Sequence, residues 1–318
     1  MKATFAKYTL HFKRPAGTSR GTLQTKDTWF LKIEDNNRYG IGECGMFRGL
    51  SHDDTPEFEE KLRWACENIY LGETNLLEAL AEYPAIQIGV ETAFRSLQAT
   101  NSFQIFPSAF SEGETSISIN GLVWMGEKAF MKQQISEKLK EGFRCIKMKI
   151  GAIDFDTELD LLKNIRSHFS AAEIELRVDA NGAFLPNEAL EKLKILSDLD
   201  IHSIEQPIKQ GQWQEMARLC QETPLPIALD EELIGVIPSE EKLKLLQTIK
   251  PQYIILKPTL VGGFSGSDQW IQFAEKQHID WWITSALESN IGLNAIAQYT
   301  ATKNSKLPQG LGTGGLFT

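Results

Sequence analysis

Two lysines lie one residue apart in the segment CIKMKIG, residues 145–151. In a β-strand alternate side chains point to opposite faces, so Lys147 and Lys149 would share a face opposite the apolar residues of the segment. An exposed edge strand can use lysines in this way to discourage aggregation. On an interior face, two adjacent like charges cost free energy and indicate a site that uses positive charge.

Three acids and another lysine follow at regular intervals. Short apolar segments end in Asp179 (RVDANG), Glu205 (SIEQP), Asp230 (ALDEE) and Lys257 (ILKP), with intervals of 26, 25 and 27 residues. On adjacent parallel strands, three carboxylates would repel one another unless a cation lies among them, and such oxygen ligands suit Mg²⁺. A single acid after a strand is commonly a helix N-cap. Three at this spacing, beside the lysines, favour a metal site.

The second part of the chain alternates between strand and helix patterns from about residue 115. An amphipathic helical pattern follows each of seven short strand candidates, which are TSISIN, RCIKMKI, EIELRVDA, IHSIEQP, PIALDEE, QYIILKP and DWWITSA. An eighth strand is expected at LPQGLGT. This count predicts a (β/α)8-type, TIM-like barrel with its site at the carboxyl ends of the strands. An open doubly wound sheet is the alternative, but no GxGxxG motif opens the first unit.

The first hundred residues have an α+β pattern. ATFAKYTLHF and DTWFLKIEDNNRYGIGE alternate apolar and polar residues, and DNN supplies a turn signal. Two stretches with helical spacing follow, TPEFEEKLRWACENIYLG and NLLEALAEYPAIQIGVETAFRSLQAT. We therefore expect an α/β protein with an N-terminal α+β domain at residues 1–110, the barrel at 111–305, and a last strand returning toward the first domain at 306–318.

Composition excludes several classes of function. The chain has 318 residues, a net charge of −9 and a pI of about 5.2, which argue against nucleic-acid or anionic-membrane partners. Its four cysteines form no CxxC pair, so we expect neither a disulfide framework nor a zinc site. The N-terminus lacks the apolar stretch of a signal peptide, and no run is long enough to span a bilayer. These features predict a cytoplasmic protein that acts on a small molecule; its oligomeric state stays open.

The ordered motif Lys-x-Lys, Asp, Glu, Asp, Lys after an α+β region resembles the enolase superfamily. Lysines on both the second and sixth strands are similar to the subgroup of muconate lactonizing enzyme. Relatives of mandelate racemase carry an Asp–His pair instead, and WWITSALES offers no histidine. The short chain, ITSALESNIGL and the ending GLGTGGLFT most resemble the o-succinylbenzoate synthase family of menaquinone biosynthesis.

This resemblance implies a lyase with a modified barrel and a capping domain. Its reaction dehydrates 2-succinyl-6-hydroxy-2,4-cyclohexadiene-1-carboxylate to 2-succinylbenzoate through an enediolate. Mg²⁺, with Mn²⁺ as a substitute, would be held by Asp179, Glu205 and Asp230. Lys149 would be the base, Lys257 would stabilise the enediolate from the opposite side, and Lys147 would contact the substrate carboxylate.

Other side chains are expected around this set. Thr284 and Ser285 end the seventh strand and are expected to bind the succinyl carboxylate. Asn181 and Glu231 follow two of the metal ligands and are expected to support them, with Asn181 also contacting substrate; a turn residue and a helix-start acid are the plainer alternatives. In the capping loop GMFRGLSHD, residues 45–53, Arg48 is a candidate carboxylate contact, although a solvated surface arginine is the alternative.

Three other functions remain open at this stage. Dipeptide epimerases and N-succinylamino acid racemases use the same two lysines, but dipeptide epimerases usually carry an Asp-x-Asp on the eighth strand, which GLGTGGLFT lacks. A barrel that binds metal and ligand without catalysis is an alternative of another class. An interaction scaffold would have no reason to place six ionisable residues at successive strand ends.

Overall fold

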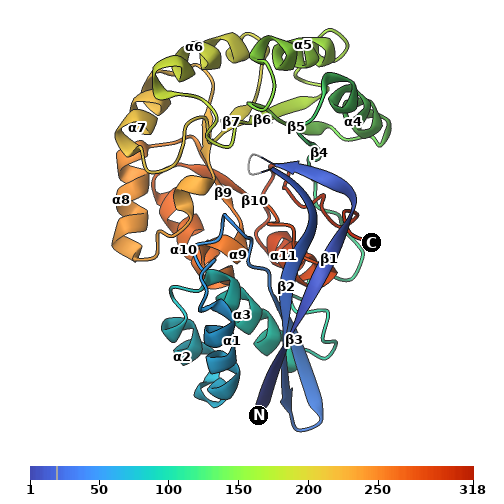
Figure 1. The fold of residues 1–318 in the computed structure, drawn as a ribbon, viewed down its shortest axis with the longest axis vertical. Helices are drawn as coiled ribbons and strands as arrows, with labels where there is room; N and C mark the ends of the chain where they lie inside the picture. The colour runs from blue at the N-terminus through green and yellow to red at the C-terminus, as the bar shows by residue number, and fades with distance from the viewer. Residues whose placement is uncertain (19–20) are drawn as a thin grey trace.

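A computed structural model describes residues 1–18 and 21–318 (Figure 1). A three-stranded antiparallel sheet with its helices precedes a curled parallel sheet whose helices lie on the outside. This arrangement confirms the predicted α/β barrel with an N-terminal capping domain. The exact domain boundaries at residues 110 and 305 stay a prediction.

The capping-domain sheet has the order β1-β2-β3, with β1 at Lys2–Thr18, β2 at Gly21–Asp35 and β3 at Arg38–Cys44. The predicted turn joins β2 to β3. Asn36 and Asn37 have φ angles of 47° and 62° there. Two consecutive left-handed residues form the hairpin turn that matches strand twist, and asparagine tolerates that conformation better than most side chains.

Helices cover one face of this sheet. Pro84 splits the second predicted helical stretch, because proline fits the first turn of a helix and not its interior. Trp29 of β2 packs its ring 4.9 Å from that of Phe58 in the buried core between sheet and helices. The helices are α1 (Phe58–Glu67), the 3₁₀ turn η1 (Ile69–Leu71), α2 (Gly72–Ala79) and α3 (Pro84–Gln98).

The barrel sheet runs in sequence order from β4 to β10, and all of its neighbours are parallel. Its strands are β4 (Gly121–Val123), β5 (Cys145–Lys149), β6 (Glu175–Asp179), β7 (Ser203–Glu205), β8 (Ile227–Leu229), β9 (Tyr253–Leu256) and β10 (Asp280–Ile283). Its helices are α4 (Lys128–Lys140), α5 (Phe155–Arg166), α6 (Pro186–Ser197), α7 (Trp213–Glu222), η2 (Glu231–Leu233), α8 (Ser239–Ile249), α9 (Pro258–Val261), α10 (Gly263–Lys276) and α11 (Asn290–Thr302).

The eighth strand expected at LPQGLGT is not a full strand. Gln309 pairs with Ile119 and Gly310 pairs with Thr284 as single parallel bridges, which close the barrel between its first and last strands. Proline lacks an N–H for the ladder, and glycine weakens a strand, so this segment cannot pair continuously. The last residues then return to the capping domain, where Phe317 pairs with Phe12 of β1.

None of the helices in the described ranges is long and apolar enough to cross a membrane.

Candidate active site

The lysine pair lies inside the barrel. β5 is hydrogen-bonded to β4 on one side and β6 on the other, so it is not an edge strand. Ile146 and Met148 join the core between sheet and helices. The side chains of Lys147 and Lys149 are only 11% and 13% exposed. The two ammonium groups therefore occupy an interior face, as a functional site requires.

Strand register brings the predicted acids beside these lysines. Lys149 is opposite Asp179, and Asp179 is opposite Glu205, so the three residues form one row across β5, β6 and β7. Asp230 and Lys257 directly follow β8 and β9. The carboxyl ends of parallel strands meet at one edge, which explains why residues about 26 positions apart converge.

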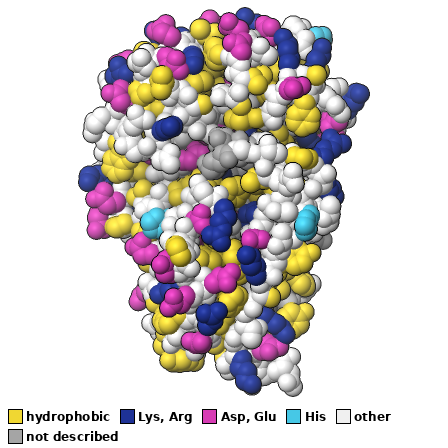
Figure 2. All heavy atoms as spheres, viewed as in Figure 1, with side chains coloured by type: hydrophobic (Ala, Val, Ile, Leu, Met, Phe, Trp, Pro, Cys, Tyr) yellow, Lys and Arg dark blue, Asp and Glu magenta, His cyan; other side chains and the backbone are white. Residues whose placement is uncertain are grey.

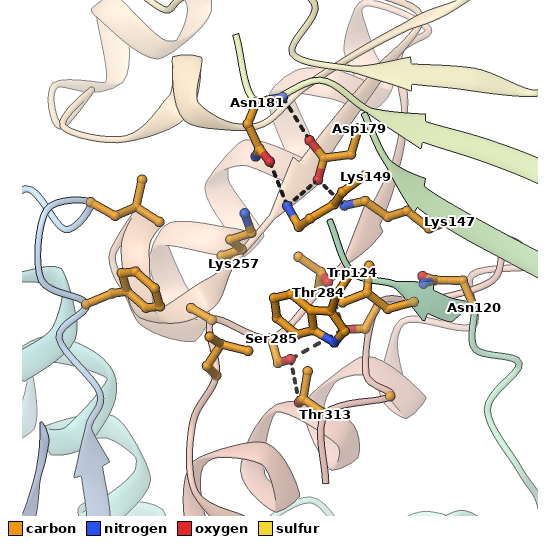
Figure 3. Close-up of a pocket in the computed structure, with 17 residues that line it drawn as sticks. Asn120, Trp124, Lys147, Lys149, Asp179, Asn181, Lys257, Thr284, Ser285 and Thr313 are labelled. Carbon is orange, nitrogen blue, oxygen red and sulfur yellow. Dashed lines mark hydrogen bonds and ion pairs between the residues drawn. The ribbon is translucent and has the colours of Figure 1, made fainter. Parts of the chain in front are cut away.

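The charged groups form a connected cluster. Lys147 Nζ lies 2.9 Å from Asp179 Oδ2 and also contacts Glu205 Oε2. Lys149 Nζ donates to Asp179 Oδ2 at 2.9 Å and to Asn181 Oδ1 at 2.7 Å (Figure 3). Lys257, also labelled in Figure 3, pairs with Asp230. Each lysine therefore has at least one carboxylate partner.

Burial and mutual charge shift the pKa values of this cluster. Burial lowers the pKa of Lys147, but the neighbouring carboxylates of Asp179 and Glu205 outweigh burial, so the net pKa is raised. Burial raises the pKa of Asp179, yet the lysines beside it lower the net value. Burial and the charge of Asp179 raise the pKa of Glu205. Glu205 is thus the acid whose negative charge is least compensated.

The cluster has room for one more cation. Its buried acids are Asp179, Glu205, Asp230 and Glu231, against three lysines. Oε1 of Glu205 and Oε2 of Glu231 are buried and have no hydrogen-bond partner. No three His, Cys, Asp or Glu side chains of the described ranges already form a cage by themselves. The excess negative charge and the two unpaired carboxylate oxygens fit a hard divalent ion.

A cavity that is partly open to solvent borders the lysines. Its charged wall contains the three lysines and Asp179, so the lining has net positive charge. Apolar side chains also line the cavity, namely Phe47 and Leu50 of the capping loop with Leu122 and Trp124 at the end of β4. Such a cavity suits an apolar ring that carries negative groups.

The structure brings most of the predicted substrate contacts to this cavity. Thr284, Ser285 and Asn181 line it. Ser285 Oγ is 2.7 Å from Thr313 Oγ1 (Figure 3), whereas Thr284 Oγ1 donates to the carbonyl of Gly310 at 2.7 Å. Glu231 accepts from Asn181 Nδ2 at 3.0 Å, which places it behind Asn181 as expected.

Arg48 is not brought to the cavity. Its guanidinium pairs with Asp54 at 2.5 Å, and its side chain is 59% exposed. The predicted contact between Arg48 and a substrate carboxylate therefore finds no support, and the solvated alternative describes its position. Phe47 and Leu50 of the same loop line the cavity instead, because the loop turns its apolar side chains inward.

Sequence reasoning missed Asn120, Trp124 and Thr313 in the cavity lining. Asn120 is 4% exposed, and its Oδ1 has no hydrogen-bond partner. It precedes β4, which begins at Gly121 and not within the predicted segment TSISIN, so a search for residues at the carboxyl ends of strands does not find it. Trp124 directly follows β4 and would have been found had that strand been placed at Gly121–Val123, whereas Thr313 lies in an irregular segment.

Comparison with known proteins gives consistent matches. The family model described as Enolase C-terminal domain-like matches residues 131–313. The whole chain is 46% identical to an o-succinylbenzoate synthase from Desulfotalea psychrophila and covers 95% of that protein. It is 33% identical to an N-succinylamino acid racemase from Thermus thermophilus, over 86% of this chain and 75% of that one.

Solved structures show the same fold. A crystal structure of MenC from Desulfotalea psychrophila superposes with a TM-score of 0.88 at 42% identity, over 100% of this chain and 95% of that one. An o-succinylbenzoate synthase from Thermosynechococcus elongatus, solved with Mg in its active site, has a TM-score of 0.79 at 21% identity, over 99% and 93% of the two chains.

Proposed function

The chain belongs to the enolase C-terminal domain-like family, and from that premise we propose that it catalyses the o-succinylbenzoate synthase reaction with Mg²⁺. The family membership and the barrel with its capping domain were predicted from the sequence and are confirmed. The synthase activity has its main support in the 46% identity over the full chain. The site supports it through three lysines and a set of acids at the carboxyl edge of the barrel.

The reaction needs removal of a proton next to a carboxylate, which puts a second negative charge on that group. Asp179, Glu205 and Asp230 would hold Mg²⁺, which supplies Lewis-acid stabilisation of this charge when bound. Lys149 would act as the base and take the proton from carbon. The protonated Lys149 would then return it to the departing hydroxyl, so one water leaves and the ring becomes aromatic.

The other lysines act by charge. We propose that Lys257, at the end of β9, stabilises the enediolate from the side opposite Lys149, and that Lys147 contacts the substrate carboxylate. Both are buried beside carboxylates, and the pKa of each is raised, so both stay cationic at neutral pH. Phe47 and Leu50 would cover the ring and exclude water.

The charges that line the cavity also favour some candidate substrates over others. Asp179 is the one acid among the described lining residues, and it already pairs with Lys147 and Lys149. An ammonium group would find no free carboxylate there, which disfavours dipeptides. N-succinyl amino acids carry two carboxylates as the synthase substrate does, and the 33% identity to a racemase keeps N-succinylamino acid racemisation as the second candidate.

The test is incubation of the purified chain and Mg²⁺ with the cyclohexadiene substrate, with formation of 2-succinylbenzoate followed by ultraviolet absorbance. In parallel, N-succinyl amino acids and dipeptides in D₂O report exchange of the α-proton. We expect turnover of the cyclohexadiene. No aromatic product together with fast exchange of N-succinyl amino acids would replace the synthase assignment by the racemase one.

A further inference from the structure

A second buried charged cluster lies where the capping domain meets the barrel. It consists of Lys26 on β2, Glu43 on β3 and Glu288 in the loop between β10 and α11, which are 7%, 2% and 2% exposed. The mechanism above uses none of these three residues. Burial of two acids and one lysine costs free energy unless the groups are paired and hydrogen-bonded. The contacts of the three side chains therefore indicate what they do.

Glu43 links the capping domain to the start of α11. Its Oε1 accepts from the backbone N–H of Ser289 at 2.8 Å and from Thr28 Oγ1 at 2.7 Å. Its Oε2 accepts from Ser289 Oγ at 2.5 Å and from the N–H of Gly292 at 2.9 Å. A carboxylate at a helix N-terminus satisfies free N–H groups and interacts favourably with the helix dipole. Here the capping carboxylate comes from the other domain.

Glu288 links two segments that line the cavity. One carboxylate oxygen accepts from Thr259 Oγ1, two residues after Lys257. The other accepts from the backbone N–H of Ala286 at 2.8 Å, next to Ser285. Glu288 therefore fixes the loop after β10 relative to the turn after β9.

Lys26 adds the start of the capping loop to these contacts. Its Nζ donates to the carbonyl of Gly45 at 3.1 Å, and Gly45 lies two residues before Phe47 of the cavity wall. A Cβ added to Gly45 would lie 3.3 Å from Glu288 Cγ and 3.6 Å from Lys26 Nζ, so the three residues converge. Burial lowers the pKa of Lys26, and the charges of Glu43 and Glu288 oppose this shift.

We propose that Lys26, Glu43 and Glu288 are positioning residues, which together hold the capping loop, the turn after Lys257 and the Ser285 segment in the register that forms the substrate cavity. This inference rests on the proposed function only in that the KM measurement below needs the synthase reaction. The three residues do not touch the reacting atoms. Their effect is on how well the preformed cavity binds substrate, because each ties one cavity-lining segment to another element.

The experiment is a double-variant series of Glu288→Gln, Lys26→Met and both together, with Lys32→Met on the exposed face of β2 as control. We expect KM for the cyclohexadiene substrate to rise about tenfold in each single variant, with kcat within about threefold of wild type. The double variant loses the contacts of both side chains, so its KM should rise at least as much as that of either single variant. Lys32→Met should change neither constant.

A second readout is independent of activity. Amide hydrogen exchange at Ala286 and Ser289 should become at least tenfold faster in Glu288→Gln and Lys26→Met, and at least as fast in the double variant. Unchanged KM and unchanged exchange at these amides would overturn the proposal. If wild type fails to convert the substrate but the exchange pattern follows this prediction, the proposed function fails while the positioning role stands.

Discussion

The amine of Lys149 has the position of a base. It lies 2.9 Å from Asp179 Oδ2 and 2.7 Å from Asn181 Oδ1, and it faces the cavity. We predict that Lys149→Ala lowers kcat by about 10²- to 10⁴-fold, the usual contribution of a general base, and leaves the affinity for 2-succinylbenzoate within a few-fold of wild type. Ultraviolet assays and isothermal titration measure the two quantities.

The matched control is Lys163→Ala, which removes an exposed lysine from α5 and should leave both quantities unchanged. Equal turnover in Lys149→Ala and wild type would exclude Lys149 as the base. Loss of turnover with retained affinity would separate a catalyst from a barrel that only binds its ligand.

Asn120 carries an unused hydrogen-bonding group into the cavity. If its Oδ1 accepts a hydrogen bond from the substrate hydroxyl, Asn120→Ala should raise KM about 5- to 30-fold with little change in kcat, because a contact made equally in the ground and transition states affects binding alone. Steady-state kinetics with the cyclohexadiene substrate measures this split. A purely structural Asn120 would instead lower the melting temperature without a selective effect on KM.

At the scale of elements, the barrel could be predicted from the sequence because each strand and helix is encoded by a residue pattern within a short segment. Alternation in CIKMKIG and the 25- to 27-residue spacing predict that the lysines and acids lie at strand ends. The register of the parallel strands then brings these side chains together in space. Residues whose placement depends on irregular segments were less accessible. Arg48 lies outside the cavity lining because the capping loop points Phe47 and Leu50 inward, and a loop turn of this kind has no periodic signature in the sequence. Its contact with a substrate carboxylate stays a prediction.

Close packing of β3 against α3 is an element-scale feature that only coordinates reveal. A Cβ added to Gly42 would lie 2.0 Å from the carbonyl oxygen of Gly89, so a side chain there forces strand and helix apart. We predict that Gly42→Ala lowers the free energy of unfolding by about 1–3 kcal/mol or more, measured by urea titration. Gly315→Ala, where an added Cβ meets nothing within 4 Å, is the control and should be near neutral.

At the scale of the whole molecule, the site contains more buried acids than lysines, so binding of a metal ion should stabilise the folded protein. We predict that EDTA abolishes turnover, that excess Mg²⁺ restores it, and that Mg²⁺ raises the melting temperature because the ion binds the folded state alone. At 100 times its Kd the ion would add about 2.7 kcal/mol. Glu205→Gln should lose most of this shift in melting temperature. Full activity after exhaustive EDTA treatment and gel filtration would contradict the metal assignment.

Stability of the whole molecule should also depend on a buried acid in the capping loop. Asp53 is 1% exposed, its Oδ2 accepts from the N–H of Ala85 at 2.9 Å, and its Oδ1 has no partner. Burial raises the pKa of Asp53 to about 7. Because an unfolded aspartate has a pKa near 4, the folded state binds the proton more tightly between about pH 4 and 7. The resulting stability is present at low pH and lost as pH rises through 7.

We therefore predict that the free energy of unfolding of wild type, relative to Asp53→Asn, falls by up to about 4 kcal/mol between pH 4 and 8. The asparagine keeps an acceptor for Ala85 and carries no charge, so the variant should be the more stable protein at pH 8. Urea titrations at several pH values measure the difference, and Asp156→Asn on exposed α5 controls for net charge. A difference that is constant with pH would mean that Asp53 stays ionised in its buried position, with the Ala85 N–H and the nearby His52 sufficient to hold the charge.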